Sequence, residues 1–181
     1  MCPNWCSCDM FIEGPEENID AFESFISKGE QAIDFNQFIP YPAKFKRLDD
    51  EAKSVVEKLE KEAGDARLID WSKVPKDGYN QGGYDWCITN WGTKWNASEP
   101  TVQRTSIGTM SAWFDTAWSP PLGVLQAMSV MFPALSFTLK YEEGGMGFAG
   151  NSTYKNGIEV EADQWDYTDE EEEEEGLFGN G

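Results

Sequence analysis

Apolar residues occupy every second position along one stretch in the second half of the chain, and this period most constrains the fold. The four positions are Leu135, Phe137, Leu139 and Tyr141. Because successive side chains of a strand point to opposite faces, the pattern predicts a strand with one buried and one solvated face. Alternating segments at 6–13, 106–117 and 158–162 extend the prediction to an antiparallel sheet that is open to solvent on one face.

Two other segments, near 15–28 and 119–132, repeat apolar residues at helical spacing. Four apolar residues mark the stripes that they would bury: Phe22, Ile26, Leu125 and Phe132. A proline stands at the start of each segment, where it suits the first turn of a helix. We therefore expect two helices that pack on the same face of the sheet.

The region between these helices changes in composition. The run at 32–39 is apolar enough to predict a second short strand. Residues 43–83 instead predict an inserted surface helix with an apolar stripe, which ends at Gly64 and is followed by a loop. A short helix rich in tryptophan is expected after it, ending near Gly92.

The resulting order is strand, helix, strand, insertion, strand, helix, strand, and a C-terminal hairpin strand. This order predicts an α+β fold of the ferredoxin-like, split β-α-β class, in which an antiparallel sheet carries two helices on one face. We expect one domain at 1–163, with the helical insertion at about 43–83, and a flexible acidic tail at 164–181.

The charge of the chain limits what it can bind. Thirty-three acidic residues against 14 basic ones give a net charge of −19. This argues against direct contact with nucleic acid, since Lys and Arg supply most of the affinity for phosphates. We expect a protein partner instead, one with a basic nucleic-acid-binding surface.

More than half of the charge imbalance lies in residues 159–175, which contain eleven acidic residues and no basic one. The run is either a solvated tail or an electrostatic decoy for a basic surface, and aromatic residues between the charges favour docking onto a partner. The acidic interaction candidates are Glu159, Glu161, Asp163, Asp166, Asp169, Glu170, Glu171 and Glu172.

The chain contains no histidine, which removes Ser-His-Asp and Cys-His catalysis and most catalytic zinc sites. We therefore expect no catalytic residue, no cofactor and no metal. The cysteines Cys2, Cys6, Cys8 and Cys87 could form a metal cluster, but their spacing differs from zinc knuckles and favours structural thiols. No signal peptide or membrane-spanning run is visible, so a cytoplasmic protein is expected.

A cluster rich in tryptophan is the other candidate site. It consists of Trp86, Trp91, Lys94, Trp95, Asp115 and Trp118, and all but Trp86 are the candidate binding residues. One interpretation is a pocket in which indoles stack a planar, nucleotide-like ligand and the two charged residues hold its polar edge. The other is that the tryptophans pack one end of the sheet. Both interpretations stay open at this point.

Five ordered motifs carry a family resemblance. They are 3–6 (PNWC), 39–42 (IPYP), 86–96 (WCITNWGTKWN), 114–121 (FDTAWSPP) and 145–150 (GMGFAG). Together they resemble the YubB-type ferredoxin-like domain family carried by phages and plasmids, over roughly residues 1–150. The resemblance implies a ferredoxin-like fold without an iron–sulfur cluster, the context of a mobile element, and no known catalytic residues.

These observations lead to one main functional hypothesis. The chain is expected to be a non-enzymatic accessory protein of a phage or plasmid that binds and inhibits a host protein through an acidic surface. A host defence system is the expected target. The alternative is a protein that binds or sequesters a nucleotide-like ligand in the tryptophan-lined pocket. The sequence indicates no oligomeric state.

Overall fold

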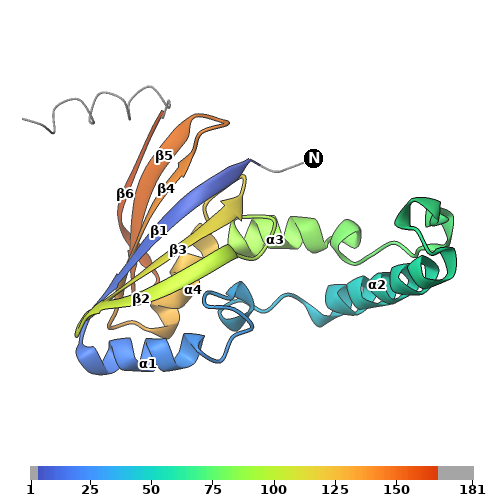
Figure 1. Cartoon of the computed structure of the whole chain (residues 1–181). Helices are drawn as coiled ribbons and strands as arrows, with labels where there is room; N and C mark the ends of the chain where they lie inside the picture. The colour runs from blue at the N-terminus through green and yellow to red at the C-terminus, as the bar shows by residue number, and fades with distance from the viewer. Residues whose placement is uncertain (1–3, 167–181) are drawn as a thin grey trace, which may run out of the picture.

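The computed structural model describes residues 4–166, which form one six-stranded antiparallel sheet, four α-helices and four short 3-10 turns (Figure 1). The strands are β1 (Trp5–Glu13), β2 (Ser98–Ser106), β3 (Thr109–Ala117), β4 (Ser136–Glu143), β5 (Phe148–Lys155) and β6 (Ile158–Asp166). The helices are α1 (Glu16–Ile26), α2 (Ala43–Ala63), α3 (Gly83–Trp91) and α4 (Leu122–Met131). The 3-10 turns are η1 (Phe35–Gln37), η2 (Ala66–Leu68), η3 (Trp71–Lys73) and η4 (Tyr79–Gln81).

The strand order is β2-β3-β1-β4-β5-β6, and each neighbouring pair is antiparallel. Helix α1 follows β1, and α4 connects β3 to β4 on the other side of β1. This connectivity gives the first four strands in space the ferredoxin-like arrangement, and β5 and β6 extend the sheet by two antiparallel strands. The predicted fold class is confirmed.

Helices α1 and α4 cover the same face of the sheet (Figure 1). Phe22, Ile26 and Leu125 are buried there, as predicted. Phe132 is half-buried and meets the Phe22 ring edge-on, with 5.1 Å between the ring centroids. The alternation in β1 places Cys6, Cys8, Met10 and Ile12 in this core and leaves the residues between them exposed.

The second strand predicted at 32–39 is wrong. This segment is a loop around η1, in which the Asp34 side chain accepts a hydrogen bond from the Asn36 backbone N–H at 3.0 Å. An aspartate that caps its own turn competes with strand pairing, although Phe35 is fully buried. The second strand of the fold is β2, which the sequence analysis missed.

The segment 106–117, predicted as one long strand, contains the last residue of β2, a tight turn at 107–108 and the whole of β3. The alternation expected of this segment is present in β3, since Met110, Ala112 and Phe114 are buried and Trp113 is exposed. The sequence analysis did not predict β2 because this strand contains Pro100 and no fully buried side chain.

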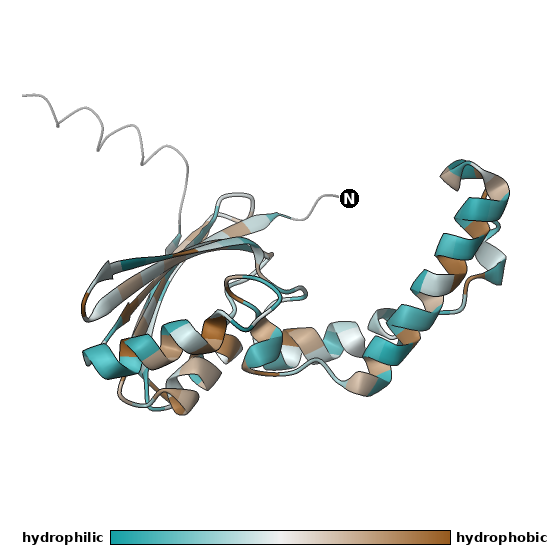
Figure 2. Cartoon of the chain, turned by 60° about the horizontal axis from the view of Figure 1, so that its bottom comes forward, coloured by the Kyte–Doolittle hydropathy of each residue, from teal (hydrophilic) through white to brown (hydrophobic). Residues whose placement is uncertain are grey.

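The predicted insertion projects from the rest of the molecule. We call residues 43–82 the arm and the rest of the described chain the body. Helix α2 points away from the sheet, and the segment with η2, η3 and η4 runs back beside it (Figures 1 and 2). Gly64 ends α2 in the left-handed conformation (φ 69°), as its sequence position predicted. Gly78 packs against the Phe45 backbone so closely that a side chain there would collide with it.

Strand β6 continues to Asp166, three residues beyond the expected domain boundary, and all of its residues are exposed. Residues 1–3 and 167–181 lie outside the described residues, and with them Cys2, Asp169, Glu170, Glu171, Glu172 and most of the expected flexible tail. Within residues 4–166, no helix has the length and apolar character needed to cross a membrane.

Candidate functional site

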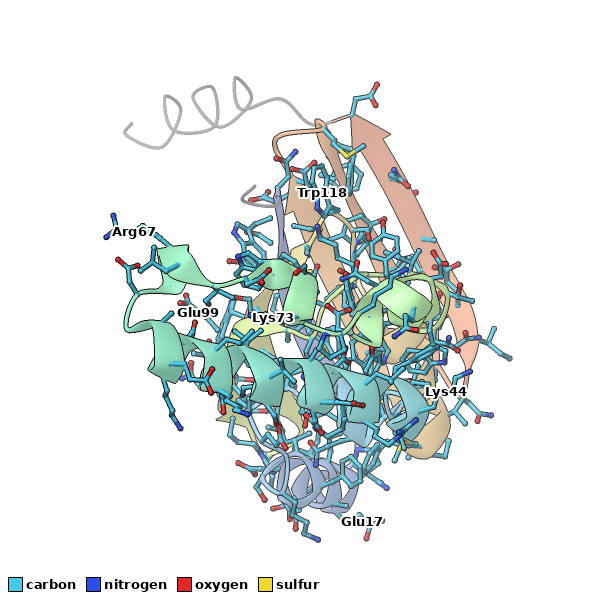
Figure 3. The ribbon with its side chains drawn as sticks, turned by 90° about the vertical axis from the view of Figure 1, so that its right-hand side faces the viewer. Glu17, Lys44, Arg67, Lys73, Glu99 and Trp118 are labelled. Atoms are coloured by element: carbon cyan, nitrogen blue, oxygen red, sulfur yellow. The ribbon has the colours of Figure 1, made fainter. Side chains whose placement is uncertain are left out.

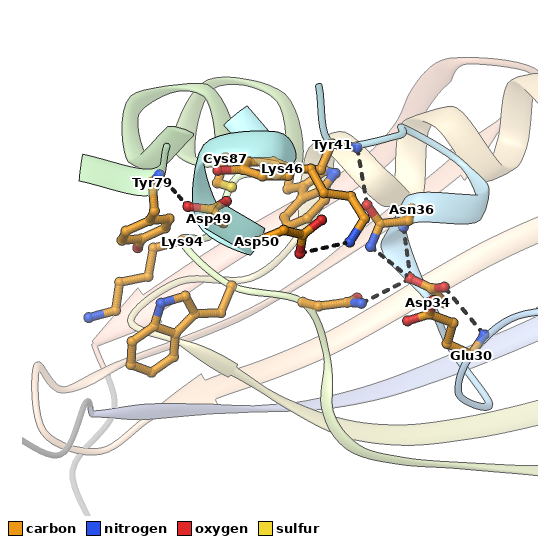
Figure 4. Close-up of a pocket in the computed structure, with 13 residues that line it drawn as sticks. Glu30, Asp34, Asn36, Tyr41, Lys46, Asp49, Asp50, Tyr79, Cys87 and Lys94 are labelled. Carbon is orange, nitrogen blue, oxygen red and sulfur yellow. Dashed lines mark hydrogen bonds and ion pairs between the residues drawn. The ribbon is translucent and has the colours of Figure 1, made fainter. Parts of the chain in front are cut away.

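A cavity of about 420 Å³ opens where the arm leaves the body (Figure 4). Its walls come from the η1 loop, the first turns of α2, η4, α3 and the segment that leads into β2. The lining residues are Glu30, Asp34, Asn36, Tyr41, Lys46, Asp49, Asp50, Tyr79, Cys87, Trp91, Lys94, Trp95 and Asn96. Segments that are far apart in the sequence therefore build one concave site.

Trp91 forms the rear of this site and is part of the core. It is buried, and its indole N–H donates to the Ile39 carbonyl oxygen at 2.9 Å. The rings of Phe35 and Trp86 meet it edge-on, with centroid distances of 5.7 and 5.5 Å. An indole packed in this way stabilises the junction of α3 with the η1 loop.

Trp95 lies at the exposed side of the site. The Lys94 ammonium nitrogen is 4.4 Å from the centroid of the Trp95 ring and 5.1 Å from that of Trp118, within the range of cation–π attraction. Trp95 also contacts Trp5 of β1, with 6.2 Å between their centroids. These aromatic contacts join the cavity to the end of the sheet.

Asp34 holds the η1 side of the cavity in place. Its Oδ1 accepts hydrogen bonds from the side-chain amides of Asn36 and Asn96, at 3.1 and 2.9 Å. Burial acts to raise the pKa of Asp34, but these amide donors, together with the backbone N–H groups of Asn36 and Glu30, outweigh it and lower the pKa. The residue is thus a charged structural anchor between η1 and the segment before β2.

Asp49 reaches the cavity from the arm, and its Oδ1 accepts the Tyr79 backbone N–H at 2.8 Å (Figure 4). Burial raises the pKa of Tyr79 to about 12. Burial and the neighbouring Asp49 carboxylate raise the pKa of Tyr41 and bring that of the Cys87 thiol to about 11. All three groups therefore stay neutral at physiological pH.

The structure brings together three members of the predicted tryptophan cluster, since Trp91, Lys94 and Trp95 line the cavity. Trp118 is linked to it only through Lys94, and its backbone is left-handed (φ 74°). Asp115 lies on the open sheet face, where it accepts a hydrogen bond from the Ser7 hydroxyl at 3.1 Å.

The sequence analysis did not predict the contributions of Tyr41, Asp49 and Tyr79. Tyr41 lies in the IPYP motif, which was a usable signal. Asp49 and Tyr79 come from the arm, and no local pattern shows that the arm folds back onto α3.

Three of the four cysteines are described: Cys6, Cys8 and Cys87 are buried free thiols. Burial raises the pKa of Cys8 well above its ordinary value. In the part of the chain that the structure describes, no group of three or more His, Cys, Asp or Glu residues could hold a metal ion. These thiols act as small apolar side chains of the core.

The second candidate site is the sheet face opposite α1 and α4, which we call the open face. Four aromatic side chains on it, each between 39% and 47% exposed, are Trp5, Phe11, Trp113 and Trp165. The strand register places six acidic residues on the same face: Asp9, Glu13, Asp115, Glu142, Glu161 and Asp163. Only Lys140 and Lys155 oppose them among its described residues.

The acidic candidates of β6 lie on two different faces of the sheet. Glu161 and Asp163 lie on the open face, in register with Thr153 and Asn151 of β5. Glu159 and Asp166 pair with Tyr154 and Phe148 and so lie on the opposite side of the sheet. There Glu159 accepts a hydrogen bond from the Ser152 hydroxyl at 2.9 Å.

Comparisons with known proteins agree with this fold. A family model described as "Ferredoxin-like domain in Api92-like protein" matches residues 87–178, just over half of the chain. The crystal structure of the protein Api92 from Yersinia pseudotuberculosis has a TM-score of 0.57 with this chain at 14% sequence identity, covering 91% of this chain and 98% of that chain. At this identity the likeness concerns the fold alone. No curated protein matches the chain.

Proposed function

We propose, from the premise that the chain belongs to the family of the ferredoxin-like domain in Api92-like proteins, that it is a non-enzymatic protein that binds a host protein through its acidic surface. Binding would inhibit that host protein, and a component of a host defence system is the proposed target. The YubB-type resemblance supports the further proposal that the chain belongs to a phage or plasmid and acts in the host cytoplasm.

The observation that carries the proposal is the open face. A row across the sheet joins Trp113, Asp9, Lys140 and Asp163 through successive strand pairs. The next row along β1 joins Asp115 and Ser7 to Glu142 and Trp165. Carboxylates and exposed aromatic rings thus lie together on one continuous surface.

Such a surface suits a basic protein better than a nucleic acid. Exposed aromatic side chains on a sheet can stack bases, but the carboxylates around them repel phosphates. The same rings provide large contact areas in protein interfaces, and complementary charge increases the rate of association. A partner that normally binds nucleic acid with Lys and Arg residues would fit this face.

The proposal is tested with the chain immobilised and exposed to host lysate at about 0.05 and 0.2 M salt, because charge-driven binding weakens steeply over this range. The captured partner is then titrated against a variant that ends after Asp166. This variant keeps β6 whole, whereas a truncation after Ala162 would cut the strand.

Removing residues 167–181 deletes seven acidic residues. If the tail assists the open face, the association rate falls strongly while the dissociation rate changes little. Partner binding that is insensitive to salt and unchanged by substitutions on the open face would contradict the proposal and direct attention to the arm or the edge of β6.

A further inference from the structure

We propose that the cavity between arm and body binds an organic cation, a protonated amine or guanidinium on a short apolar chain. The lining residues of this site are not those of the open face, which it approaches where Trp95 contacts Trp5, and its occupation requires no partner protein. It also differs from the nucleotide-like site expected from the tryptophan cluster, because the charges in the cavity point to a ligand of opposite sign.

The charges of the lining favour a cation. Four carboxylates line the cavity, those of Glu30, Asp34, Asp49 and Asp50, against two ammonium groups. Lys46 is paired with Asp50 at 3.6 Å, and both side chains are more than 60% exposed, so this pair is screened by water. The phosphates of a nucleotide would meet a net negative wall.

Two hydroxyl oxygens give the site directional acceptors. The oxygens of Tyr41 and Tyr79 are buried and make no hydrogen bond of good geometry, although Tyr41 lies beside the Asp49 carboxylate and Tyr79 beside the Trp95 side chain. Both tyrosines line the cavity and are held neutral by burial, so their lone pairs can accept N–H donors. Buried polar atoms are usually paired, and a bound ammonium or guanidinium would pair these.

Asp49 is the carboxylate best placed to take the charge. Its Oδ1 is fixed by the Tyr79 backbone N–H, which sets the orientation of the carboxylate inside the cavity (Figure 4). Asp34, by contrast, already accepts three hydrogen bonds at Oδ1, two from side-chain amides and one from a backbone N–H. A ligand N–H group would therefore find its charged acceptor at Asp49.

The aromatic walls suit the rest of such a ligand. Trp95 and Trp118 already hold the Lys94 ammonium group, which shows that indole rings at this end of the molecule accommodate a cation. The volume of about 420 Å³ lies in the range of small-molecule sites. Tyr41, Tyr79 and Trp91 can cover the apolar chain of the ligand.

A monovalent probe tests the site, since a chain of charge −19 attracts polycations without specificity. Butylguanidinium is titrated into the full-length protein and followed by the indole and backbone N–H signals in NMR spectra. We expect saturable shifts at Trp95, Tyr79 and Asp49, with a dissociation constant on the order of millimolar, and no shifts at Trp113 or Trp165. Butanol, a neutral analogue, should produce none of them.

Asp49→Asn removes the charge and keeps the acceptor for the Tyr79 N–H, so the fold should survive. It should weaken butylguanidinium binding roughly tenfold or more, as expected for loss of a charged hydrogen bond. Tyr79→Phe should weaken binding less. The matched control Glu57→Gln, an exposed carboxylate on α2, should change nothing.

A second arm of the experiment uses Nα-acetylarginine methylamide. Equal saturation by both probes supports the site and indicates that it can receive an arginine side chain from another protein. Saturation by butylguanidinium alone supports the site and indicates a free cation. Shifts that do not saturate, that butanol reproduces, or that persist undiminished in Asp49→Asn would overturn the proposal.

Discussion

The body and the arm of this molecule differ in how many apolar side chains they bury. The body encloses an extensive core between the sheet and two helices, with Phe22, Phe137 and Leu139 fully buried. The arm buries almost nothing, since Ala52 and Ile69 are its buried apolar side chains in the described chain. At its outer end Leu68 and Trp71 are 70% and 62% exposed.

The two regions also differ in net charge. Nine basic and nine acidic residues lie in the arm, so the arm is neutral, and of the surplus of −19 the body carries −12 and residues 167–181 carry −7. Arg67 and Lys73, labelled in Figure 3, lie on η2 and η3, in the part of the arm that extends away from the sheet in Figure 1. The comparison teaches that the acidic character belongs to the body, where it can act on a partner, whereas the arm supplies walls to the cavity.

The largest effect is expected from a substitution in the body. Leu125→Ala removes a buried side chain of α4 and should lower the free energy of unfolding by about 2–5 kcal/mol. Val130→Ala in the same helix, where the side chain is 58% exposed, is the control and should change it by less than about 0.5 kcal/mol. Denaturant unfolding measures both. Similar values would mean that α4 does not pack on the sheet.

The junction between the regions should respond to alkaline pH. The pKa of Cys87 is raised from its ordinary 9.0 to about 11 in the folded protein. Stability from the neutral thiol is therefore complete below pH 9 and is lost as pH rises towards 11, by at most about 2 kcal/mol. Cys87→Ala should flatten this part of the stability curve. Equal slopes for the two proteins would contradict the buried position of Cys87.

A smaller and local effect is expected in the arm. Gly64→Ala places a side chain in the left-handed conformation that ends α2, at a cost of about 1 kcal/mol. Hydrogen exchange should accelerate in the last turns of α2 and remain unchanged in β1. Glu57→Ala, an exposed position of α2, serves as control. Faster exchange throughout the body would show that the two regions unfold together.

The smallest effect concerns a surface contact of the body. Arg104 of β2 donates to Asp20 and Glu23 of α1 at 2.8 and 2.9 Å. Arg104→Gln should lower the melting temperature slightly at low salt, and the difference should vanish at high salt because exposed ion pairs are screened. A difference that is independent of salt would indicate that packing, not charge, is lost.

Sequence periodicity predicted most of the body correctly. Residues in β1, β4 and both core helices alternate or repeat strongly because each element has one buried side. Strand β2 was missed because its inward side carries Arg104 and half-buried Val102, which give a weak pattern. The segment 32–39 was misread because Ile33 and Phe35 are buried by a turn that Asp34 and Asn96 hold, a contact across 62 residues.

The cavity was only partly predictable for the same reason. The tryptophan-rich motif 86–96 identified Trp91, Lys94 and Trp95. Sequence spacing could not show that Asp115 lies on the open face of the sheet instead of in the cavity. Nor could it show that Asp49 and Tyr79 return from the arm. Long-range placement of polar residues leaves no periodic trace in the sequence.

The central claim, that the open face of the body binds a basic host protein, is tested most directly by comparing two variants of equal charge. One variant carries Asp9→Asn, Asp115→Asn and Glu161→Gln on the open face, and the other carries Glu57→Gln, Glu60→Gln and Glu62→Gln on the arm. Both are immobilised beside the unmodified chain in host lysate, and the retained proteins are quantified by mass spectrometry. The account predicts that a basic protein retained by the unmodified chain and the arm variant is lost from the open-face variant. Equal retention by all three, or loss from the arm variant alone, would contradict it.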